Sequence, residues 1–531
     1  MVARVILLAT LLVPFAFAPP AIAETDDFGP YHPILVDWDA KRADGYYTST
    51  NSSTLAWAEA YVLNAFMAGY RLTGDTYWLG RIADHTDTLL ANLRDVPESV
   101  PYDTSIYADG YRGWGSTGYY AGDYDEYIVH DGCVGSAIAE YIAEVFNNPD
   151  ELWDEFGDRA KAHFDTLSYH VAGKWLANWD ADRYNASTYG TVLRHYGGFE
   201  RLPHNQANAF GSFLVFLNDV VNSPKWAELN GEISPDYYMP YIDEMAAFLK
   251  NDLRVGAGDS YQWGYWPGGG DEDVSHANIT VEFAWICYKR GIVFDETDMK
   301  RFANTMSKLM WNGSFENVGI NKYNRPGADY AWTNYIWSWA YLSEADPFLF
   351  HIYHNFFRHR TSFSYYDIAG AIRNWLNADL AGGLNYPITI RVEDDGDGVA
   401  RPGETVTLHV AFKNYGVAPD TSDYVYVDLE SVFPNDGVFV LIDVDDDPLV
   451  IEPDSTAELS VTVTIPADFS GAAIRPIVSA RGMLGGEPRE MSKEFTVTSG
   501  NPAFLQVTPD PPTNLPYDAD ISSFLPKARH T

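Results

Sequence analysis

Apolar residues recur at intervals of three and four positions through most of the first 380 residues, which is the pattern of amphipathic helices. The segment 53–70 is one such helix, and a turn with Gly74 and Asp75 separates it from a second helix over 76–93. This helical pair recurs roughly every 60 to 77 residues. The further predicted helices are 132–146 and one within 151–167, 205–221 and 239–253, 275–288 and 296–311, 332–342 and 348–357, and 365–376.

Long loops rich in Gly, Tyr, Trp and Asp separate these pairs, so the repeat is longer than that of a simple solenoid. Five to six or seven helical hairpins with long loops at one end predict a mainly α fold. We expect an (α/α) toroid over residues 24–383. The alternative is an open solenoid, which shorter and more regular loops would indicate.

The pattern changes near residue 385, where short alternating runs separated by Gly, Pro and Asp turns begin. These runs predict a smaller antiparallel β-sandwich over 384–498. Residues 392–415 in particular resemble the immunoglobulin-like modules found behind secreted enzymes. The acidic turn 394–398 (DDGDG) is a candidate for a structural calcium ion, with a plain acidic hairpin as the alternative. Residues 499–531 are Pro-rich and polar, which predicts an extended tail.

Residues 1–23 combine a basic residue, an apolar run and a small-x-small end, which predicts a secretory signal peptide. The mature protein would be secreted or periplasmic, without membrane insertion after cleavage. The alternative is an anchoring helix, for which the apolar run is short. Only Cys133 and Cys287 are present, too few for a disulfide scaffold, and they could form one disulfide or remain two thiols.

The net charge of −39 excludes nucleic acid as a partner, because phosphates would be repelled. Such an acidic, lysine-poor chain suits high salt, so we expect a halophilic surface. A polyanionic substrate stays possible, since salt screens exposed charge beyond about 10 Å and a few basic residues can set the local field. The oligomeric state is not predictable from these data.

Many of the 16 Trp and 36 Tyr residues lie beside Gly in loops rather than in apolar runs. Two such loops contain Trp114 and Trp263, and Arg112 precedes the first of these rings. Because ring faces stack on the C–H surfaces of sugars, we expect these loops to line a carbohydrate-binding cleft. The alternative is that the rings belong to the core.

Three histidines stand at the starts of predicted helices, 74 and 72 residues apart. They are His130, His204 and His276, and Asn205 follows the second. Helices that repeat at this period in a toroid start at the same end, so we expect these residues to converge on one cleft. Helix starts carry free N–H groups and partial positive charge, which suits an anionic sugar.

One reaction class that fits is β-elimination from a uronate-containing polysaccharide. It requires neutralisation of the carboxylate, removal of the C5 proton and protonation of the leaving oxygen. The candidate catalytic residues are His204, Asn205, His276, Tyr261 and Tyr265. The candidate substrate-binding residues are His130, Arg112, Trp114, Trp263, Glu272, Lys322, Tyr323 and Arg325. No cofactor and no catalytic metal is required.

The adjacent His204 and Asn205, followed by a Tyr-containing loop, resemble the motif of toroidal polysaccharide lyases of the alginate and glucuronan type. The resemblance implies an Asn and a His near the uronate and a Tyr on a later loop. Those families read Asn then His, whereas this chain has His204 then Asn205, so the resemblance does not assign individual roles. The same toroid serves uronate epimerases, which share the proton abstraction.

Two other functions fit the same residues. A toroidal glycoside hydrolase needs two carboxylates, and Asp131, Asp271, Glu272 and Asp273 lie at the same helix starts. Acidic residues also favour the first turn of any helix as caps. The third possibility is a carbohydrate-binding protein without catalysis.

Overall fold

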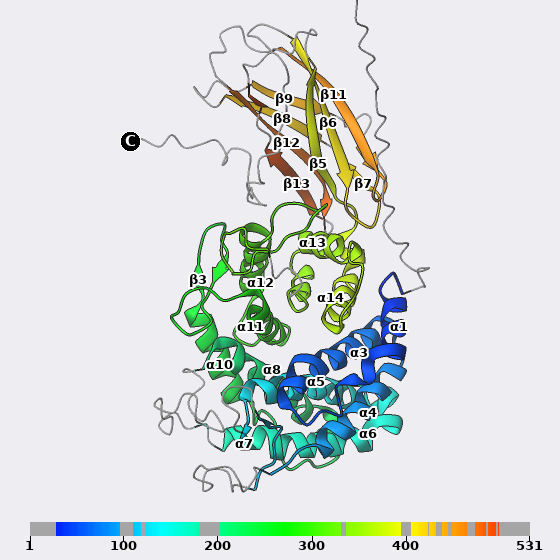
Figure 1. Cartoon of the computed structure of the whole chain (residues 1–531), viewed down its shortest axis with the longest axis vertical. Helices are drawn as coiled ribbons and strands as arrows, with labels where there is room; N and C mark the ends of the chain where they lie inside the picture. The colour runs from blue at the N-terminus through cyan, green and yellow to red at the C-terminus, as the bar shows by residue number, and fades with distance from the viewer. Residues whose placement is uncertain are drawn as a thin grey trace, which may run out of the picture.

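A computed structural model shows a mainly helical domain followed by a smaller antiparallel β region (Figure 1). The structure describes residues 28–95, 110–117, 124–177, 179, 202–330, 336–393, 405–422, 424–431, 438–443, 449–464, 473–484, 487–494 and 497–498. The predicted signal peptide, the 394–398 turn and the predicted tail lie outside these residues. None of the described helices has both the length and the apolar character needed to cross a bilayer.

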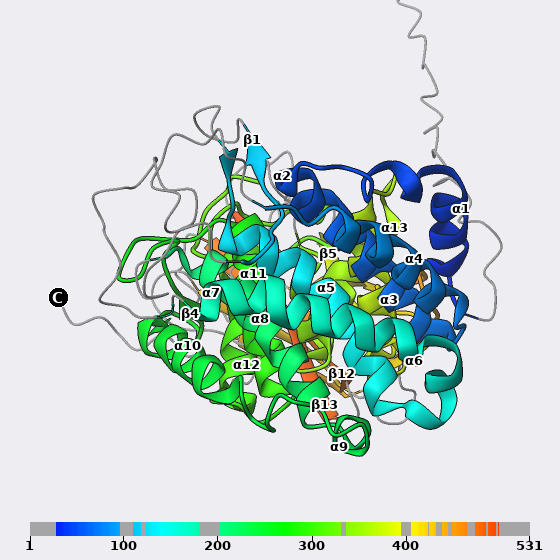
Figure 2. The same cartoon turned by 90° about the horizontal axis from the view of Figure 1, so that it is seen from below.

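Six elements form the centre of the helical domain, and each packs between two others of the set. They are α3 (Ala60–Thr73), α5 (Ile128–Asn147), α8 (His204–Val221), α11 (Val274–Tyr288), the 3-10 helix η8 (Trp339–Ser343) and α14 (Tyr365–Trp375). They contact one another in chain order, and the last, α14, contacts α3. Seen from below, α5 and α8 lie side by side across the domain (Figure 2). We call these six the inner elements.

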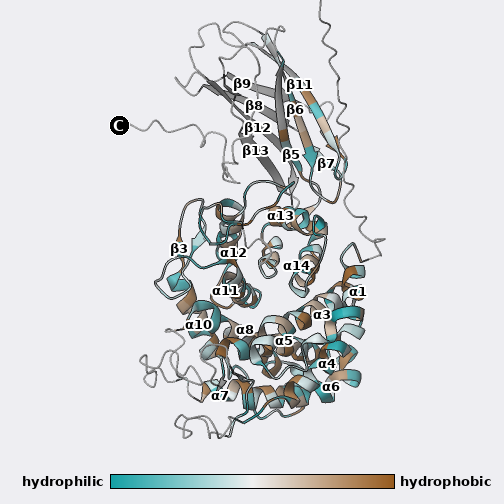
Figure 3. Ribbon diagram, in the orientation of Figure 1, coloured by the Kyte–Doolittle hydropathy of each residue, from teal (hydrophilic) through white to brown (hydrophobic). Residues whose placement is uncertain are grey.

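A second helix packs on the outside of each inner element. These outer helices are α1 (His32–Arg42) against α14, α4 (Tyr77–Ala91) against α3, α6 (Pro149–Thr166) against α5, α10 (Met239–Asp252) against α8, α12 (Glu296–Asn304) against α11 and α13 (Pro347–Arg358) against η8. Hydrophobic and hydrophilic residues alternate along α4 and α6, because one side faces the inner elements (Figure 3).

Shorter helices complete this domain. They are η1 (Ala43–Gly45), α2 (Ser52–Thr54), the π-helix η2 (Leu55–Glu59), the π-helix η3 (Leu167–Ala172), α7 (Gly173–Leu176), α9 (Pro224–Glu228), the π-helix η7 (Thr305–Met310) and α15 (Ala378–Ala381). Cys133 and Cys287 do not form a disulfide, and burial raises the pKa of both thiols.

All paired strands of the structure are antiparallel. One sheet has the order β11-β6-β5, another the order β13-β12-β8-β9 with β14 beside β12, and β7 pairs with β10. Two further short pairs, β1 with β2 and β3 with β4, lie in loops of the helical domain. The strands are β1 (Ser116–Thr117), β2 (Tyr124–Asp125), β3 (Arg254–Val255), β4 (Tyr261–Gln262), β5 (Asn385–Glu393), β6 (Thr405–Asn414), β7 (Asp420–Ser422), β8 (Tyr424–Ser431), β9 (Val438–Asp443), β10 (Leu449–Ile451), β11 (Thr456–Thr464), β12 (Ala473–Leu484), β13 (Glu487–Glu494) and β14 (Val497–Thr498).

The β region is attached to the helical domain by a packed aromatic contact. The ring of Phe315 lies 5.1 Å from that of Tyr386 and 4.9 Å from that of Tyr415, centroid to centroid. Glu316 accepts hydrogen bonds from Lys413 at 2.7 Å and from the hydroxyl of Tyr415 at 2.9 Å. Burial opposes ionisation of Glu316, but these two donors hold the pKa of its carboxyl below the usual value.

Candidate functional site

The N-terminal halves of α5, α8 and α11 pack together in the helical domain. Tyr127 and Val129 at the start of α5 contact Ala209 of α8 and Ile279 of α11 in one small apolar cluster. His130 is the third residue of α5, His204 the first of α8 and His276 the third of α11. The three histidines named from the sequence therefore all lie in the first turn of inner helices.

His276 forms a dyad with Asp273, the N-cap residue of α11. One carboxylate oxygen of Asp273, Oδ1, accepts from the backbone N–H groups of Ser275 and His276 at 3.1 and 3.3 Å. The other, Oδ2, lies 2.5 Å from Nδ1 of His276. A carboxylate at this distance keeps the imidazole proton on Nδ1, so Nε2 is the acceptor nitrogen of the ring.

The contacts of the dyad stabilise the ionised form of Asp273. Burial opposes ionisation of Asp273, but the hydrogen bonds and charge of His276 outweigh it and lower the pKa of the carboxyl. The His276 side chain keeps 36% of its surface exposed, so solvent reaches it. Among the three histidines, this one combines a fixed tautomer with access to solvent.

His204 is 1% exposed and connects α8 to the loop 263–270. Its backbone N–H donates to the carbonyl of Tyr265 at 2.9 Å, and its Nε2 lies 2.8 Å from Oδ2 of Asp252. Asp252 Oδ1 in turn accepts from the backbone N–H of Gly268 at 2.9 Å. Burial lowers the pKa of His204, so its ring is neutral near pH 7. These contacts make it a residue that positions the loop.

The loop 263–270 places Tyr265 against the dyad. The ring centroids of Tyr265 and His276 are 4.9 Å apart, with the planes at 62°. The tight fold of the loop requires Gly264, where a Cβ would lie only 2.7 Å from the backbone of Gly269 and Gly270. Trp266, in the same loop, is 38% exposed. Tyr265 is therefore the hydroxyl-bearing residue closest to His276 in this loop.

Glu272 lies under the loop as a buried carboxyl. It is fully buried, and its Oε2 accepts from the indole N–H of Trp263 and from Thr280 Oγ1, the latter at 3.2 Å. Burial raises the pKa of Glu272 well above its usual value. Asn324 fixes the backbone here, since it accepts from the N–H of Glu272 at 3.2 Å and donates to the carbonyl of Trp263 at 2.8 Å.

A basic segment lies beside the start of α11. The backbone N–H of Val274 donates to the carbonyl of Lys322 at 2.7 Å, and Asp273 forms a β-bridge with Tyr323. The cationic groups of Lys322 and Arg325 each lie 5.3 Å from the ring centre of Tyr323. Arg325 also pairs with Asp271 at 2.8 Å and keeps 54% of its side chain exposed. These residues offer positive charge next to His276.

The structure corrects the expectation for three aromatic residues. Trp263 is fully buried and Trp114 is 2% exposed, with its indole N–H donating to the carbonyl of Leu89 at 2.8 Å. Neither ring has a free face for a sugar, so both belong to the core. Tyr261 is 4% exposed, and its hydroxyl donates to Asp298 at 2.6 Å. Burial, together with this hydrogen bond, raises its pKa to about 12, so Tyr261 does not fit a catalytic role.

Two polar candidates are buried in the helix starts. His130 is fully buried, with Nδ1 at 2.9 Å from Ser52 Oγ and an edge contact to Trp57, and burial lowers its pKa to about 3. It therefore contacts no substrate directly. Asn205 is 2% exposed, and its Oδ1 has no hydrogen-bond partner among the described residues. Arg112 is 54% exposed, with its guanidinium 3.8 Å from Asp95 and its backbone N–H on His170.

A buried cluster of charged side chains packs against the start of α5. The ammonium of Lys174 lies 2.9 Å from Glu126 and 2.6 Å from Asp131, and all three side chains are fully buried. Asp131 also accepts from the indole N–H of Trp175 at 2.7 Å. This pairing occupies a carboxylate that the sequence offered as a catalytic acid or base.

Sequence reasoning did not identify two residues that hold the site together, Asp252 and Asn324. Asp252 is the last residue of α10, where an acidic side chain opposes the helix dipole. That unfavourable placement was a usable signal that the carboxylate has another partner. Asn324 gave no such signal, because its contacts depend on how two loops meet. The described residues contain no group of His, Cys, Asp and Glu suited to hold a metal ion.

Comparisons with known proteins identify no family for this chain. No protein-family profile and no curated protein matches the sequence. Among solved structures, the sporulation control protein Spo0M from Bacillus subtilis is 16% identical, with 22% of this chain and 50% of that chain aligned and a TM-score of 0.16. The DNA-bound alkylpurine DNA glycosylase AlkC from Pseudomonas fluorescens is 10% identical over 88% of this chain and 99% of that chain, with a TM-score of 0.15. Similarities this low do not indicate a function.

Proposed function

We propose that this chain is a secreted polysaccharide lyase that cleaves a uronate-containing polysaccharide by β-elimination. The observation that carries the proposal is the dyad of His276 and Asp273, with Tyr265 in ring contact and a basic segment beside it. With its Nδ1 on the Asp273 carboxylate and 36% of its side chain exposed, His276 can offer Nε2 as the base for a weakly acidic carbon-bound proton. The reaction needs no cofactor.

The proposed steps balance as follows. Nε2 of His276 takes the C5 proton of the uronate, and the electron pair forms the C4–C5 double bond as the C4–O bond breaks. The Tyr265 hydroxyl gives its proton to the departing oxygen. Arg325 and Lys322 bind the uronate carboxylate and stabilise the negative charge that develops on it. His204, through Tyr265, is a positioning residue.

The carboxylates at this end of the domain favour elimination over hydrolysis. Asp131 pairs with Lys174, Asp271 with Arg325 and Asp273 with His276, while Glu272 is fully buried. A hydrolase needs two carboxyl groups on opposite sides of the glycosidic bond. Since each of these four has another partner or is shielded, hydrolysis is the second candidate.

The architecture supports an (α/α) toroid as the scaffold. The six inner elements contact one another in succession and return from α14 to α3, with an outer helix on each. Under this proposal residues 1–23 are the signal peptide, and the β region is an immunoglobulin-like β-sandwich that spaces or attaches the enzyme. The excess of acidic residues keeps it hydrated in salt.

The test is incubation of the mature protein with alginate, glucuronan, ulvan and neutral glycans. Elimination gives products with a conjugated double bond, seen by ultraviolet absorbance, and only on uronate polymers. Reducing ends without that absorbance indicate hydrolysis. Incorporation of deuterium at C5 in heavy water without cleavage indicates an epimerase. Binding without any change in the polymer indicates a carbohydrate-binding protein, and each of these last three results contradicts the proposal.

A further inference from the structure

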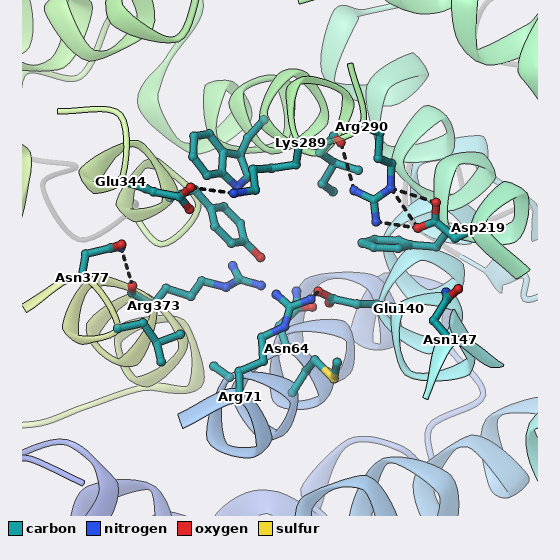
Figure 4. Close-up of a pocket in the computed structure, with 17 residues that line it drawn as sticks. Asn64, Arg71, Glu140, Asn147, Asp219, Lys289, Arg290, Glu344, Arg373 and Asn377 are labelled. Atoms are coloured by element: carbon teal, nitrogen blue, oxygen red, sulfur yellow. Dashed lines mark hydrogen bonds and ion pairs between the residues drawn. The ribbon is translucent and has the colours of Figure 1, made fainter. Parts of the chain in front are cut away.

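A cavity lies at the C-terminal ends of the inner helices, away from the helix starts that hold the three histidines. Figure 4 shows the side chains that line it. Its volume is about 570 Å³, within the range of small-molecule sites. Residues near the C-terminal ends of α3, α5, α8, α11 and α14, and from η8, line it. The lining includes Arg71, Glu140, Asp219, Arg290, Tyr341 and Arg373.

The charge of this cavity differs from that of the whole chain. Four basic and three acidic residues line it, whereas the chain as a whole has 35 basic and 74 acidic residues. Helix C-termini favour cations, because the last carbonyl groups carry partial negative charge. The helix ends therefore account for the basic residues in the cavity.

The cations at the rim of the cavity are fully paired. Arg290 binds Asp219 through two nitrogens, with contacts of 2.8 and 2.5 Å to the same Oδ2. Lys289 binds Glu344 at 2.6 Å, and both of these side chains are more than 40% exposed. These pairs neutralise one another and leave no donor that needs a ligand.

Arg373, deeper in the cavity, is not fully paired as the cations at the rim are. Arg373 is 5% exposed, its nearest carboxylate is Glu282 at 3.7 Å, and its Nη1 has no hydrogen-bond partner among the described residues. A charge-assisted hydrogen bond would be about 2.7–2.9 Å long, so Glu282 does not satisfy this guanidinium. Figure 4 shows the side chains of Arg71 and Arg373 both pointing into the cavity, one from α3 and the other from α14. The Tyr341 ring, 4.4 Å away, holds Arg373 in this orientation.

We propose that this cavity binds a small organic acid through its carboxylate, with Arg373 and Arg71 as the ligands. Nη1 of Arg373 is a buried donor without a hydrogen-bond partner among the described residues, which is costly, and a carboxylate bound in the cavity would accept from it. Arg71 binds Glu140 at 2.7 Å and is 38% exposed, so the ligand enters from its side. The volume exceeds what an inorganic anion needs, which favours an organic acid.

The test is calorimetric titration of the full chain with sodium glucuronate at constant ionic strength, with glucose and sulfate in parallel. We expect glucuronate to bind, glucose not to bind, and Arg373→Met to weaken glucuronate about tenfold or more, as the loss of a charged hydrogen bond predicts. Arg290→Met is the matched control at the rim and should change the affinity less than about threefold.

Several results would overturn the proposal. These are unchanged affinity in Arg373→Met, equal binding of glucose, or equal binding of sulfate, which would mean a general anion site. Thermal unfolding without ligand shows whether Arg373→Met is folded. Arg373→Lys provides a second comparison, because it keeps the charge but loses the planar pair of guanidinium N–H donors. The site is independent of the proposed lyase activity: His276→Ala should bind glucuronate in this cavity normally, and Arg373→Met should leave polysaccharide turnover unchanged.

Discussion

Replacing Asp273 separates the two functions of its carboxylate. Oδ1 caps α11 and Oδ2 binds His276, so the residue needs both oxygens. Asp273→Asn keeps one oxygen, which preserves the cap but not the charged contact with the imidazole. Asp273→Ala removes both. The difference in unfolding free energy between the two variants therefore measures the contribution of the cap. The difference between the wild type and Asp273→Asn measures the contribution of the contact with His276.

The expected magnitudes follow from the geometry. Loss of an N-cap costs about 1 kcal/mol of unfolding free energy. The hydrogen bond to His276 is charge-assisted but partly exposed, so its loss costs about 1 kcal/mol as well. Asp273→Asn should thus lose about 1 kcal/mol and Asp273→Ala about 2 kcal/mol. Turnover should fall by about 10²-fold or more in both, because Nε2 no longer acts as an oriented base.

The assay is urea unfolding followed by circular dichroism, at neutral pH and in acid. The folded-state pKa of Asp273 is lowered. The ionised carboxylate therefore contributes fully to the free energy of unfolding above the usual carboxyl pKa, and this contribution is lost as the pH falls through the folded-state pKa. The difference in unfolding free energy between the wild type and Asp273→Asn should therefore become smaller in acid. Equal stability of the Asn and Ala variants, or a difference that does not change with pH, would refute this reasoning.

Three further predictions concern buried groups. Glu272→Gln should retain the fold and flatten the pH dependence of the unfolding free energy, because the raised pKa makes the wild type lose stability as the pH rises above about 4.5; identical pH profiles of the two proteins in urea unfolding would contradict a raised pKa of Glu272. Lys174→Met should cost about 3–5 kcal/mol, since it leaves two fully buried carboxylates without their cation; a loss below 1 kcal/mol in the same assay would contradict this. Phe315→Ala should cost about 3–5 kcal/mol and separate the unfolding of the β region from that of the helical domain; a single unchanged calorimetric transition would argue against it.

The coarse fold was predictable from the hydrophobic pattern. A mainly helical domain with a smaller antiparallel β region follows from periods of three to four and of two residues, and both are confirmed. Helix α1 was not predicted, because its sequence has little amphipathic character and its packing against α14 depends on the ends of the domain meeting. Among the described residues of the predicted helix 332–342, only the short 3-10 helix η8 forms.

The histidine positions were predictable for a different reason. The local hydrophobic pattern placed them at helix starts, and all three are in first turns. Their exposure was not predictable, because burial of His130 and His204 depends on which loops cover each helix start. The same limit applies to Trp263, whose Gly-rich neighbours indicated a loop but not that the ring points inward.

The central claim is that the dyad at the start of α11 catalyses elimination. The most direct measurement compares the wild type, His276→Ala and His204→Ala on glucuronan and alginate, following ultraviolet absorbance of the conjugated product and its mass. We predict an unsaturated product from the wild type and loss of turnover in both variants, with circular dichroism of the fold unchanged. Full activity in His276→Ala, or a saturated product one water heavier, would contradict the account.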